Sequence, residues 1–412
     1  MARCARLLER SNPDLVRPRK NRDISIVHGF AGATAWLLQP LLRRKLTPVS
    51  SFPTLTAIRV AWGVMDAMVN HQGRHRRGSA QSFLAADVGG THARLALVRE
   101  ARADPRTIEL IAYRKLTCGD YASLVDLLRA FLKSDVAGAV GHCVLACAGQ
   151  VIDDEVIHDN LAWPVSLGEV QDRLGFDALF VLNDFEALGY ALADADRLGT
   201  RLLCGPDVVA SGPKLVVGPG TGLGAAVHLP NGPGFVIATE AGQMDFAAQT
   251  LREREVLACL APEGGYVPCE RVLSGPGLLT LYRTLCDLNG APPCLATPET
   301  ITDAARQRTD ANATEAVDLF CAALGSFVGN LAMDFMARGG VYLAGGFLSA
   351  MFDLLQRSEF ATRFLHGRSI RIFLEHVPVC VMEHGQHGVL GAARYYLGGF
   401  GLDRTLRERL TE

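Results

Sequence analysis

Residues 83–98 read FLAADVGGTHARLALV, two apolar runs on either side of a pair of glycines. Each run has the length and apolar content of a buried strand, so a strand, a tight turn and a second strand are predicted. Because Gly89 and Gly90 have no side chain, backbone N–H groups of the turn can approach a bulky anion. Thr91 can donate a further hydrogen bond to a phosphate oxygen. The segment therefore favours a phosphate-binding turn, with a simple tight hairpin as the alternative.

Asp87 stands at the end of the first predicted strand. A carboxylate cannot face a phosphate directly without repulsion, so its expected role is to hold Mg²⁺ through a water molecule. Mg²⁺ keeps several of its own waters and is usually bound through one or two carboxylates together with substrate phosphates. Asp87 is accordingly the predicted metal residue.

The same arrangement recurs at residues 214–229, where two further apolar runs flank the turn GPGTGLG. Glycines occupy four alternate positions of this turn, and Thr221 supplies a hydroxyl. The turn has no lysine and leads into a strand, so it matches neither a P-loop nor a dinucleotide-binding fingerprint. A flexible turn is the alternative, but a second glycine hairpin after a second apolar strand favours a second phosphate contact.

A third glycine pair, Gly345-Gly346, follows the apolar strand 341–343, where small residues allow a flat ligand such as an adenine ring to lie against the backbone.

Strands and helices are mixed along residues 83–397, and the strand–glycine turn–strand arrangement occurs twice. This pattern predicts two α/β domains with a cleft between them, which is the usual place for a ligand. Helices are predicted at 121–132, 166–174, 185–193, 250–260, 277–288, 298–306, 313–336, 347–356, 361–365 and 389–397.

Charge is distributed unevenly along the chain. Of its 412 residues, 41 are Lys or Arg and 43 are Asp or Glu, but residues 1–82 hold 14 of the basic and only 4 of the acidic ones. The net charge of −2 argues against a general nucleic-acid-binding protein, and 49% hydrophobic residues exclude a wholly disordered chain. Residues 1–82 are expected to be a disordered basic extension, or translated sequence upstream of a later start such as Met65 or Met68.

An apolar stretch, 24–42, lies within this extension and has about the length of a membrane-spanning helix. His28, Gln39 and Pro40 interrupt it, and no clear small-residue cleavage site follows, so neither a signal peptide nor a membrane anchor is expected. The 11 cysteines form no CxxC pair and no zinc-type cluster. That usage is typical of a reducing compartment and predicts a cytoplasmic protein.

Asn183 and Asp184 stand between the apolar strand 178–182 and the helix 185–193. An Asp at a strand end can accept the proton of a substrate hydroxyl, as the nucleophile-orienting carboxylate does in phosphoryl transfer. An Asn beside it can hydrogen-bond to sugar hydroxyls. The alternative is that the pair caps the helix, because Asn and Asp are favoured N-cap residues.

Further side chains that suit a sugar lie in turn-rich segments. Glu240, Gln243 and Glu270 can form hydrogen bonds with hydroxyl groups. The alternatives are a surface ion pair of Glu270 with its neighbour and a solvated Gln243. Asn160 lies in one loop with Trp163, where an amide and an aromatic face would suit a sugar ring; a core Trp and a turn Asn are the alternative there.

In this order, these residues resemble the bacterial-type glucokinase family, a branch of the hexokinase, actin and chaperone-ATPase superfold. The resemblance extends from Phe83 to the closing helix 389–397. Its most specific part is ERVLSGPG at 270–277, a string that few other families carry. The other matching segments are ADVGGTHARLAL (86–97), LNDF (182–185), GTGLG (220–224), EAGQMDFA (240–247) and YLAGG (342–346).

The resemblance implies ATP-dependent phosphorylation of glucose at its 6-hydroxyl, with ATP and Mg²⁺ as cofactors and Asp184 as the catalytic base. The implied partner is glucose or a related hexose, with no nucleic acid and no membrane, and family members often form homodimers. The implied substrate-binding residues are Asn183, Glu240, Gln243 and Glu270, to which the loop residue Asn160 is added. The implied cofactor-binding residues are Ala86, Asp87, Val88, Gly89, Gly90, Thr91, Gly220, Thr221, Gly222, Gly224, Gly345 and Gly346.

The family fold consists of two actin-like, ribonuclease H-like α/β domains with a cleft between them. The resemblance implies that the last helix returns to pack on the first domain. The small domain is therefore predicted to comprise 83–194 with 388–412, and the large domain 195–387.

The chain departs from the family at two positions of the site. The family typically has a sugar-contacting His where this chain has Gln243, and an Asn where this chain has His92. A glutamine still forms hydrogen bonds, but its reach and charge differ, so a kinase for another hexose is the first alternative function. A sugar-sensing regulator with weak catalysis is the second. Related repressors carry an N-terminal helix-turn-helix, and prolines interrupt any such helical pair in 1–82, at Pro13, Pro18, Pro40, Pro48 and Pro53.

Overall fold

The computed structural model describes residues 82–398 apart from 102–106, 136–138, 153, 158–160, 231–233, 368 and 384. All of these belong to one unit of the chain, Arg77–Glu412. The predicted extension therefore lies outside the described residues except for Ser82, and so does the apolar stretch 24–42.

The first sheet has five strands in the order β3-β2-β1-β4-β8. The predicted hairpin is confirmed, because β1 pairs antiparallel with β2; β1 also pairs parallel with β4, and β4 parallel with β8. The carboxyl ends of β1, β4 and β8 therefore meet at one edge of the sheet. The strands are β1 (Phe83–Val88), β2 (His92–Glu100), β3 (Ile108–Thr117), β4 (His142–Cys147) and β8 (Ala178–Asn183).

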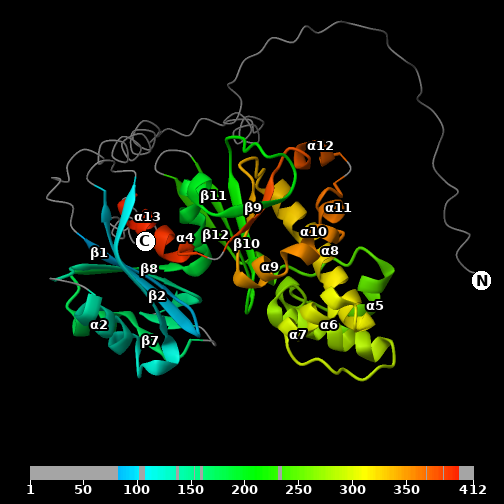
Figure 1. The fold of residues 1–412 in the computed structure, drawn as a ribbon, viewed down its shortest axis with the longest axis horizontal. Coiled ribbons are helices and arrows are strands. Elements are labelled where there is room, and N and C mark those ends of the chain that lie inside the picture. Colours follow the sequence, from blue (N-terminus) through cyan, green and yellow to red (C-terminus); the bar gives the residue numbers. More distant parts are fainter. Residues whose placement is uncertain are drawn as a thin grey trace, which may run out of the picture. The chain divides into compact units, whose positions relative to one another are not determined.

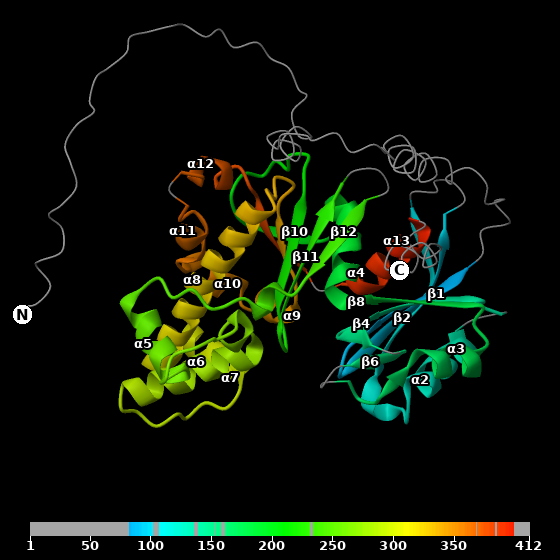
Figure 2. The same ribbon diagram turned by 180° about the vertical axis from the view of Figure 1, so that it is seen from behind.

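Alternate residues of β1 pack into two different cores. Leu84 and Ala86 join the core that includes α2 and α3, whereas Phe83 and Ala85 join the core that includes α13. Because both faces of the sheet are buried, the strand reads as a continuous apolar run and not as an alternating one. Figure 2 shows α2 and α3 on one side of this sheet and α13 on the other. These helices are α2 (Leu124–Asp135), α3 (Leu167–Leu174) and α13 (His387–Leu397).

The second sheet repeats this plan in six strands, in the order β12-β11-β10-β13-β14-β9. The hairpin β10–β11 is antiparallel, and β10, β13 and β14 run parallel. A small third sheet holds β5, β6 and β7. The strands are β10 (Lys214–Pro219), β11 (Leu223–Leu229), β12 (Phe235–Thr239), β13 (Val341–Leu343), β14 (Val379–Met382), β9 (Thr200–Cys204), β5 (Gln150–Ile152), β6 (Glu155–Ile157) and β7 (Val165–Ser166).

Helices α5 to α12 follow the second hairpin, and Figure 1 shows α5 to α8 grouped on one side of this sheet. Among the described residues, α8 is the one helix long and apolar enough to cross a membrane, but 78% of its most apolar window is buried within the fold. Such burial is typical of the central helix of a core. The helices are α5 (Leu251–Leu260), α6 (Gly275–Leu288), α7 (Pro298–Gln307), α8 (Ala311–Asp334), α9 (Gly346–Ala350), α10 (Phe352–Arg357), α11 (Phe360–Phe364) and α12 (Arg371–Leu374).

Helix α4 (Asp184–Ala191) and α13 pack against each other in a third core that contains residues of both large sheets. Figure 1 shows the two helices side by side. Gly391 of α13 lies so close to the carbonyl oxygen of Ala187 that no Cβ would fit, and a Cβ at Gly189 would come within 2.6 Å of Val236 on β12. Helix α4 thus touches strands of both large sheets. The α/β prediction is confirmed, and the predicted domain limits remain a prediction.

Candidate active site

Three parallel strands bring polar residues together at their carboxyl ends. The register aligns Val88 of β1 with Cys147 of β4, and Cys147 with Asn183 of β8. Burial raises the pKa of the Cys147 thiol, and the charges of Asp87 and Asp184 act in the same direction. Both carboxylates therefore lie near the end of β4. In an open α/β sheet, this edge is where ligands bind.

Asn183 is the N-cap of α4. Its side-chain oxygen accepts hydrogen bonds from the backbone N–H groups of Phe185 at 2.8 Å and Glu186 at 3.4 Å, and its amide nitrogen donates to the Gly149 carbonyl at 3.5 Å. The capping alternative therefore applies to Asn183. The cap also fixes the start of α4, where half-buried Asp184 is the first helical residue, with Oδ1 at 2.9 Å from the Phe185 nitrogen. Capping thus orients the predicted base.

Phe185 connects α4 to the second glycine hairpin. Gly218 and Gly224 face each other across β10 and β11. A Cβ at Gly224 would lie only 2.0 Å from Cδ2 of the Phe185 ring, and one at Gly218 would lie 2.8 Å from the ring's Cζ. These glycines are therefore required by the packing of the aromatic ring. The start of α4, with Asp184, is held directly against the hairpin.

The first hairpin holds Asp87 beside Arg94, with Nη1 and Oδ2 3.4 Å apart. Burial raises the pKa of Asp87 above its ordinary value, although the neighbouring guanidinium opposes the rise. The carboxylate also lies against the first turn of α13, where a Cβ at Gly388 would come within 2.5 Å of Asp87 Cγ. A helix N-terminus is a favourable place for a negative charge.

Asp87 is a single carboxylate, and a metal bound by it would need other ligands. Within the described ranges, no group of three or more His, Cys, Asp or Glu side chains is placed to hold a metal ion. Mg²⁺ on nucleotide phosphates needs only one or two carboxylates, because phosphate oxygens and water fill its other positions. The residues present therefore fit a Mg²⁺–nucleotide and not a closed protein site.

Gly89 and Gly220, at the two hairpin turns, are not required by packing within the protein. The nearest described atom to a Cβ at Gly89 would be the His92 carbonyl oxygen at 3.6 Å, and a Cβ at Gly220 would meet no described atom within 4 Å. Side chains there would occupy space through which a phosphate could reach the backbone. Gly345 differs, because its φ of 107° favours glycine for conformational reasons. Both hairpin turns thus have the open backbone that a phosphate site needs.

Glu270 lies in η5 (Cys269–Arg271), just before α6, and the first residue of α6 is hydrogen-bonded to the second hairpin. Gly275 donates its N–H to the Gly220 carbonyl at 2.9 Å. A Cβ at Gly222 would lie 3.0 Å from Glu270 Oε2. The Glu270 carboxylate therefore borders the turn itself, next to the predicted phosphate position.

Gln243 ends η4 (Ala241–Gln243) and is exposed. The Tyr266 hydroxyl donates to its backbone carbonyl and lies 3.4 Å from its side-chain oxygen. Residues 244–246 run beside 267–269, with two backbone hydrogen bonds of 2.8 Å between them. The loops that carry Gln243 and Glu270 are therefore joined, and Gln243 has a protein partner in addition to solvent.

A cavity of about 320 Å³ lies between the β8–α4 connection and β12. It brings together two of the predicted sugar-binding residues, Asn183 and Glu240, whereas Gln243 and Glu270 do not line it. Asn160 lies outside the described residues, so its predicted role stays a prediction.

Two polar residues of this cavity were not predicted, Glu186 and Thr239. Glu186 lies in the first turn of α4, where an acidic residue is ordinary helix chemistry, so the sequence carried no signal for it. Trp163 follows the core alternative, because its Nε1 donates to the Tyr121 carbonyl at 2.8 Å and its ring packs on the first sheet's core.

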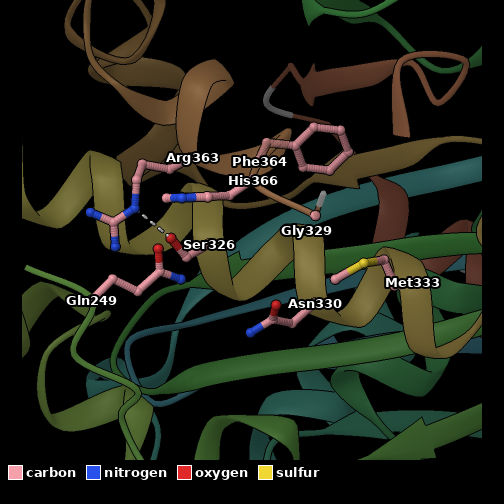
Figure 3. Close-up of a pocket in the computed structure, with 9 residues that line it drawn as sticks. Gln249, Ser326, Gly329, Asn330, Met333, Arg363, Phe364 and His366 are labelled. Atoms are coloured by element: carbon pink, nitrogen blue, oxygen red, sulfur yellow. Dashed lines mark hydrogen bonds between the residues drawn. The ribbon is translucent and has the colours of Figure 1, made fainter. Parts of the chain in front are cut away.

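A second cavity, of about 380 Å³, lies among α8, α11 and the loop before α5 (Figure 3). None of the predicted site residues that the structure describes lines it. Arg363, the charged side chain among its described lining residues, is bound to the buried carboxylate of Glu253 and to the Ser326 hydroxyl. That ion pair is therefore part of the packing of this half of the fold.

Known proteins resemble this chain over most of the described residues. The family model Glucokinase matches residues 84–398. A glucokinase-like protein of Xylella fastidiosa is 44% identical over 318 residues, covering 77% of this chain and 95% of that protein. A glucokinase of Marinobacter nauticus is 36% identical over 311 residues, covering 75% and 95%.

Among solved structures, a glucokinase from an Antarctic psychrotroph superposes with a TM-score of 0.67 at 30% identity, covering 76% of this chain and 98% of that one. This likeness confirms the predicted fold class for the described residues. With the family model matching most of the chain, it follows that the chain belongs to the glucokinase family.

Proposed function

We propose that this chain is an ATP-dependent hexose kinase that phosphorylates glucose at its 6-hydroxyl, with Asp184 as the base. The observation that carries the proposal is the junction at the start of α4. The Asn183 cap fixes Asp184 at one sheet edge, and Phe185 holds it against an open glycine turn. Membership of the glucokinase family supports the same reaction class.

The chemistry follows from these placements. Phosphoryl transfer requires mainly positioning and charge neutralisation, with one carboxylate orienting the nucleophile. In the proposal, Asp184 accepts the proton of the sugar hydroxyl, and Asn183 and Glu240 hold neighbouring hydroxyls in the cavity that they line. Glu270, beside Gly222, would fix the side of the sugar that faces the second hairpin.

The two hairpin turns would bind the nucleotide phosphates at their open backbone beside Gly89 and Gly220. The N–H groups of these two glycines already donate within the turns, to the carbonyls of His92 at 3.1 Å and Gly222 at 2.8 Å, so other N–H groups of the turns would face the phosphates. Asp87 would hold Mg²⁺ through water, and that ion would neutralise phosphate charge when bound. Gly345 and Gly346, after β13, would lie beside the adenosine.

A kinase for another hexose is the second candidate, and Gln243 is the observation that favours it. Tyr266 engages the backbone carbonyl and approaches Oε1 of Gln243, which leaves the amide N–H₂ as its group for a sugar. A neutral amide donor selects hydroxyls differently from the histidine that the family typically has.

Cellular location and assembly remain proposals as well. The ten described cysteines are free thiols, which is compatible with the proposed cytoplasmic location. A homodimer is proposed from the family resemblance alone, and the mass of the purified chain in solution measures it.

The decisive experiment is ADP release by the purified full chain over a panel of sugars, glucose and N-acetylated hexosamines included. Asp184→Asn should lower sugar-dependent turnover by about 10²–10⁴-fold, the usual contribution of a general base. Asp172→Asn, an exposed aspartate on α3, is the matched control and should retain turnover. Full activity of Asp184→Asn would refute the assigned base. Silence on every sugar, with ATP still bound, would favour a sugar-sensing regulator.

A further inference from the structure

We infer that Phe185 is a positioning residue that sets the distance between the base Asp184 and the nucleotide hairpin. The inference rests on the proposed function and adds a residue to it. Phe185 would touch neither sugar nor nucleotide, and it would act through the two elements that it joins.

The ring occupies a slot made by a cross-strand pair of glycines. Gly218 and Gly224 are direct partners on β10 and β11. The ring's Cγ, Cδ2 and Cε2 lie where a side chain at Gly224 would begin, and its Cζ lies 2.8 Å from the position of a Cβ at Gly218. Because neither glycine has a side chain, the ring packs directly on the backbone of both strands. The ring and the glycine pair therefore form one fitted contact.

This contact lies next to the predicted base on one side and next to the predicted phosphate-binding turn on the other. Asp184 precedes Phe185 in the chain, and its backbone is fixed by the Asn183 cap. On the other side, the turn after Gly218 is closed by a 2.8 Å hydrogen bond from Gly220 N–H to the Gly222 carbonyl. These hydrogen bonds fix the backbone of Asp184 and the shape of the turn after Gly218. The position of the Phe185 ring between the two therefore determines the distance from the Asp184 carboxylate to the turn.

The body of α4 is held independently of the ring. Gly189 lies against Val236, and Ala187 lies against Gly391 of α13. Shortening Phe185 should therefore leave α4 docked while its first turn gains freedom. A misplacement of about 1 Å at a reacting group can cost about 10²-fold in rate. A positioning role thus predicts a loss in kcat that exceeds the loss in thermal stability.

The test combines kinetics with a compensating pair of substitutions in the full chain. Phe185→Leu should lower kcat at least tenfold, with the KM for sugar changed less than threefold. Phe180→Leu, on neighbouring β8 and packed against Tyr396 at 5.7 Å between ring centroids, is the matched control and should retain kcat. Gly224→Ala should lower the Tm, because its Cβ overlaps the ring. The double variant, with Phe185→Ala and Gly224→Ala, should have a Tm no lower than that of Phe185→Ala alone, because the ring that the new Cβ would overlap is gone.

Three results would overturn the inference. Equal kcat for Phe185→Leu and Phe180→Leu would show that the ring has no positioning role. A Gly224→Ala penalty that persists in the Phe185→Ala background would show that ring and glycine are not in contact. A wild-type chain inactive on every sugar would refute the proposed function and, with it, the inference; the first two results arise in an active wild type, so the failures are distinguishable.

Discussion

Substituting the arginine of a buried ion pair should lower the Tm of this protein much more than substituting the arginine of an exposed pair. Arg363 on α11 and Glu253 on α5 lie 2.8 Å apart, with side chains only 9% and 3% exposed. Arg363 also donates from Nε to the Ser326 hydroxyl at 2.8 Å (Figure 3). Arg363→Met keeps most of the apolar volume and leaves the Glu253 carboxylate buried without its partner.

The expected loss follows from that burial. Breaking a buried pair by removing one partner costs about 3–5 kcal/mol, because an uncompensated charge remains. Each kcal/mol lowers the Tm of a domain of 150–250 residues by about 2–4 °C. The Tm of Arg363→Met should therefore fall by roughly 6–20 °C.

The matched control is Arg371→Met. Arg371 and Glu375 are also 2.8 Å apart, but their side chains are 58% and 44% exposed. Such pairs contribute about 0–1 kcal/mol, so the Tm should barely change. Thermal unfolding of both variants at pH 7, followed by circular dichroism, makes the comparison.

A second substitution distinguishes loss of charge pairing from loss of packing. In the Arg363→Met background, Glu253→Gln removes the unpaired charge. Its amide oxygen can still accept from the backbone N–H groups of Gln249 and Thr250, as the carboxylate does. Part of the lost Tm should return. Equal small changes in Arg363→Met and Arg371→Met, or no recovery in the double variant, would refute the reasoning.

Three further predictions concern acid stability, helix packing and the extension. Burial alone would raise the pKa of Glu253, but hydrogen bonds from Arg363 and the backbone hold it below its ordinary value of about 4.5. The ionised Glu253 carboxylate therefore stabilises the fold fully above its ordinary pKa, and this stabilisation is lost as the pH falls through the lowered pKa. The Tm of the wild type should accordingly decline more steeply between pH 5 and 3 than the Tm of Glu253→Gln. Gly391→Ala should cost about 1–3 kcal/mol by overpacking, whereas Gly119→Ala, where a Cβ meets no described atom within 4 Å, should stay within about 0.5 kcal/mol in urea unfolding. Deletion of residues 1–82 should leave sugar-dependent ADP release unchanged, and lost activity in a folded truncation would contradict that expectation.

Most of the regular elements could be predicted from local sequence. The buried strands β1, β8 and β13 were predicted at or within one residue of their ends, because continuous apolar runs bounded by Gly, Asn or Asp are strong signals. The long helix α8 was predicted for the same reason.

The two edge strands of the second sheet, β12 and β9, were missed. Strand β12 exposes Phe235 and Ile237 while burying Val236, so its sequence shows no polar alternation. Among the described strands, β9 pairs only with β14, which is distant in the chain, so the local sequence gives no signal for this partner. The single helix predicted at 347–356 is divided into α9 and α10 at Met351.

For the site, the sequence by itself determined the kinds of residues and their order. The sequence alone identifies two glycine turns, the pair Asn183-Asp184 and the later glutamates as candidate site residues. Only the tertiary structure decided which of them meet. Gly224 looks like a phosphate-binding glycine in sequence, yet its missing side chain makes room for Phe185.

The same holds for Gln243 and Asn183, whose neighbours Tyr266 and Gly149 come from loops elsewhere in the chain. Local patterns encode strand and helix because backbone geometry repeats every two or 3.6 residues. Contacts between distant segments have no such period, so they become visible only once the two sheets have packed around α4 and α13.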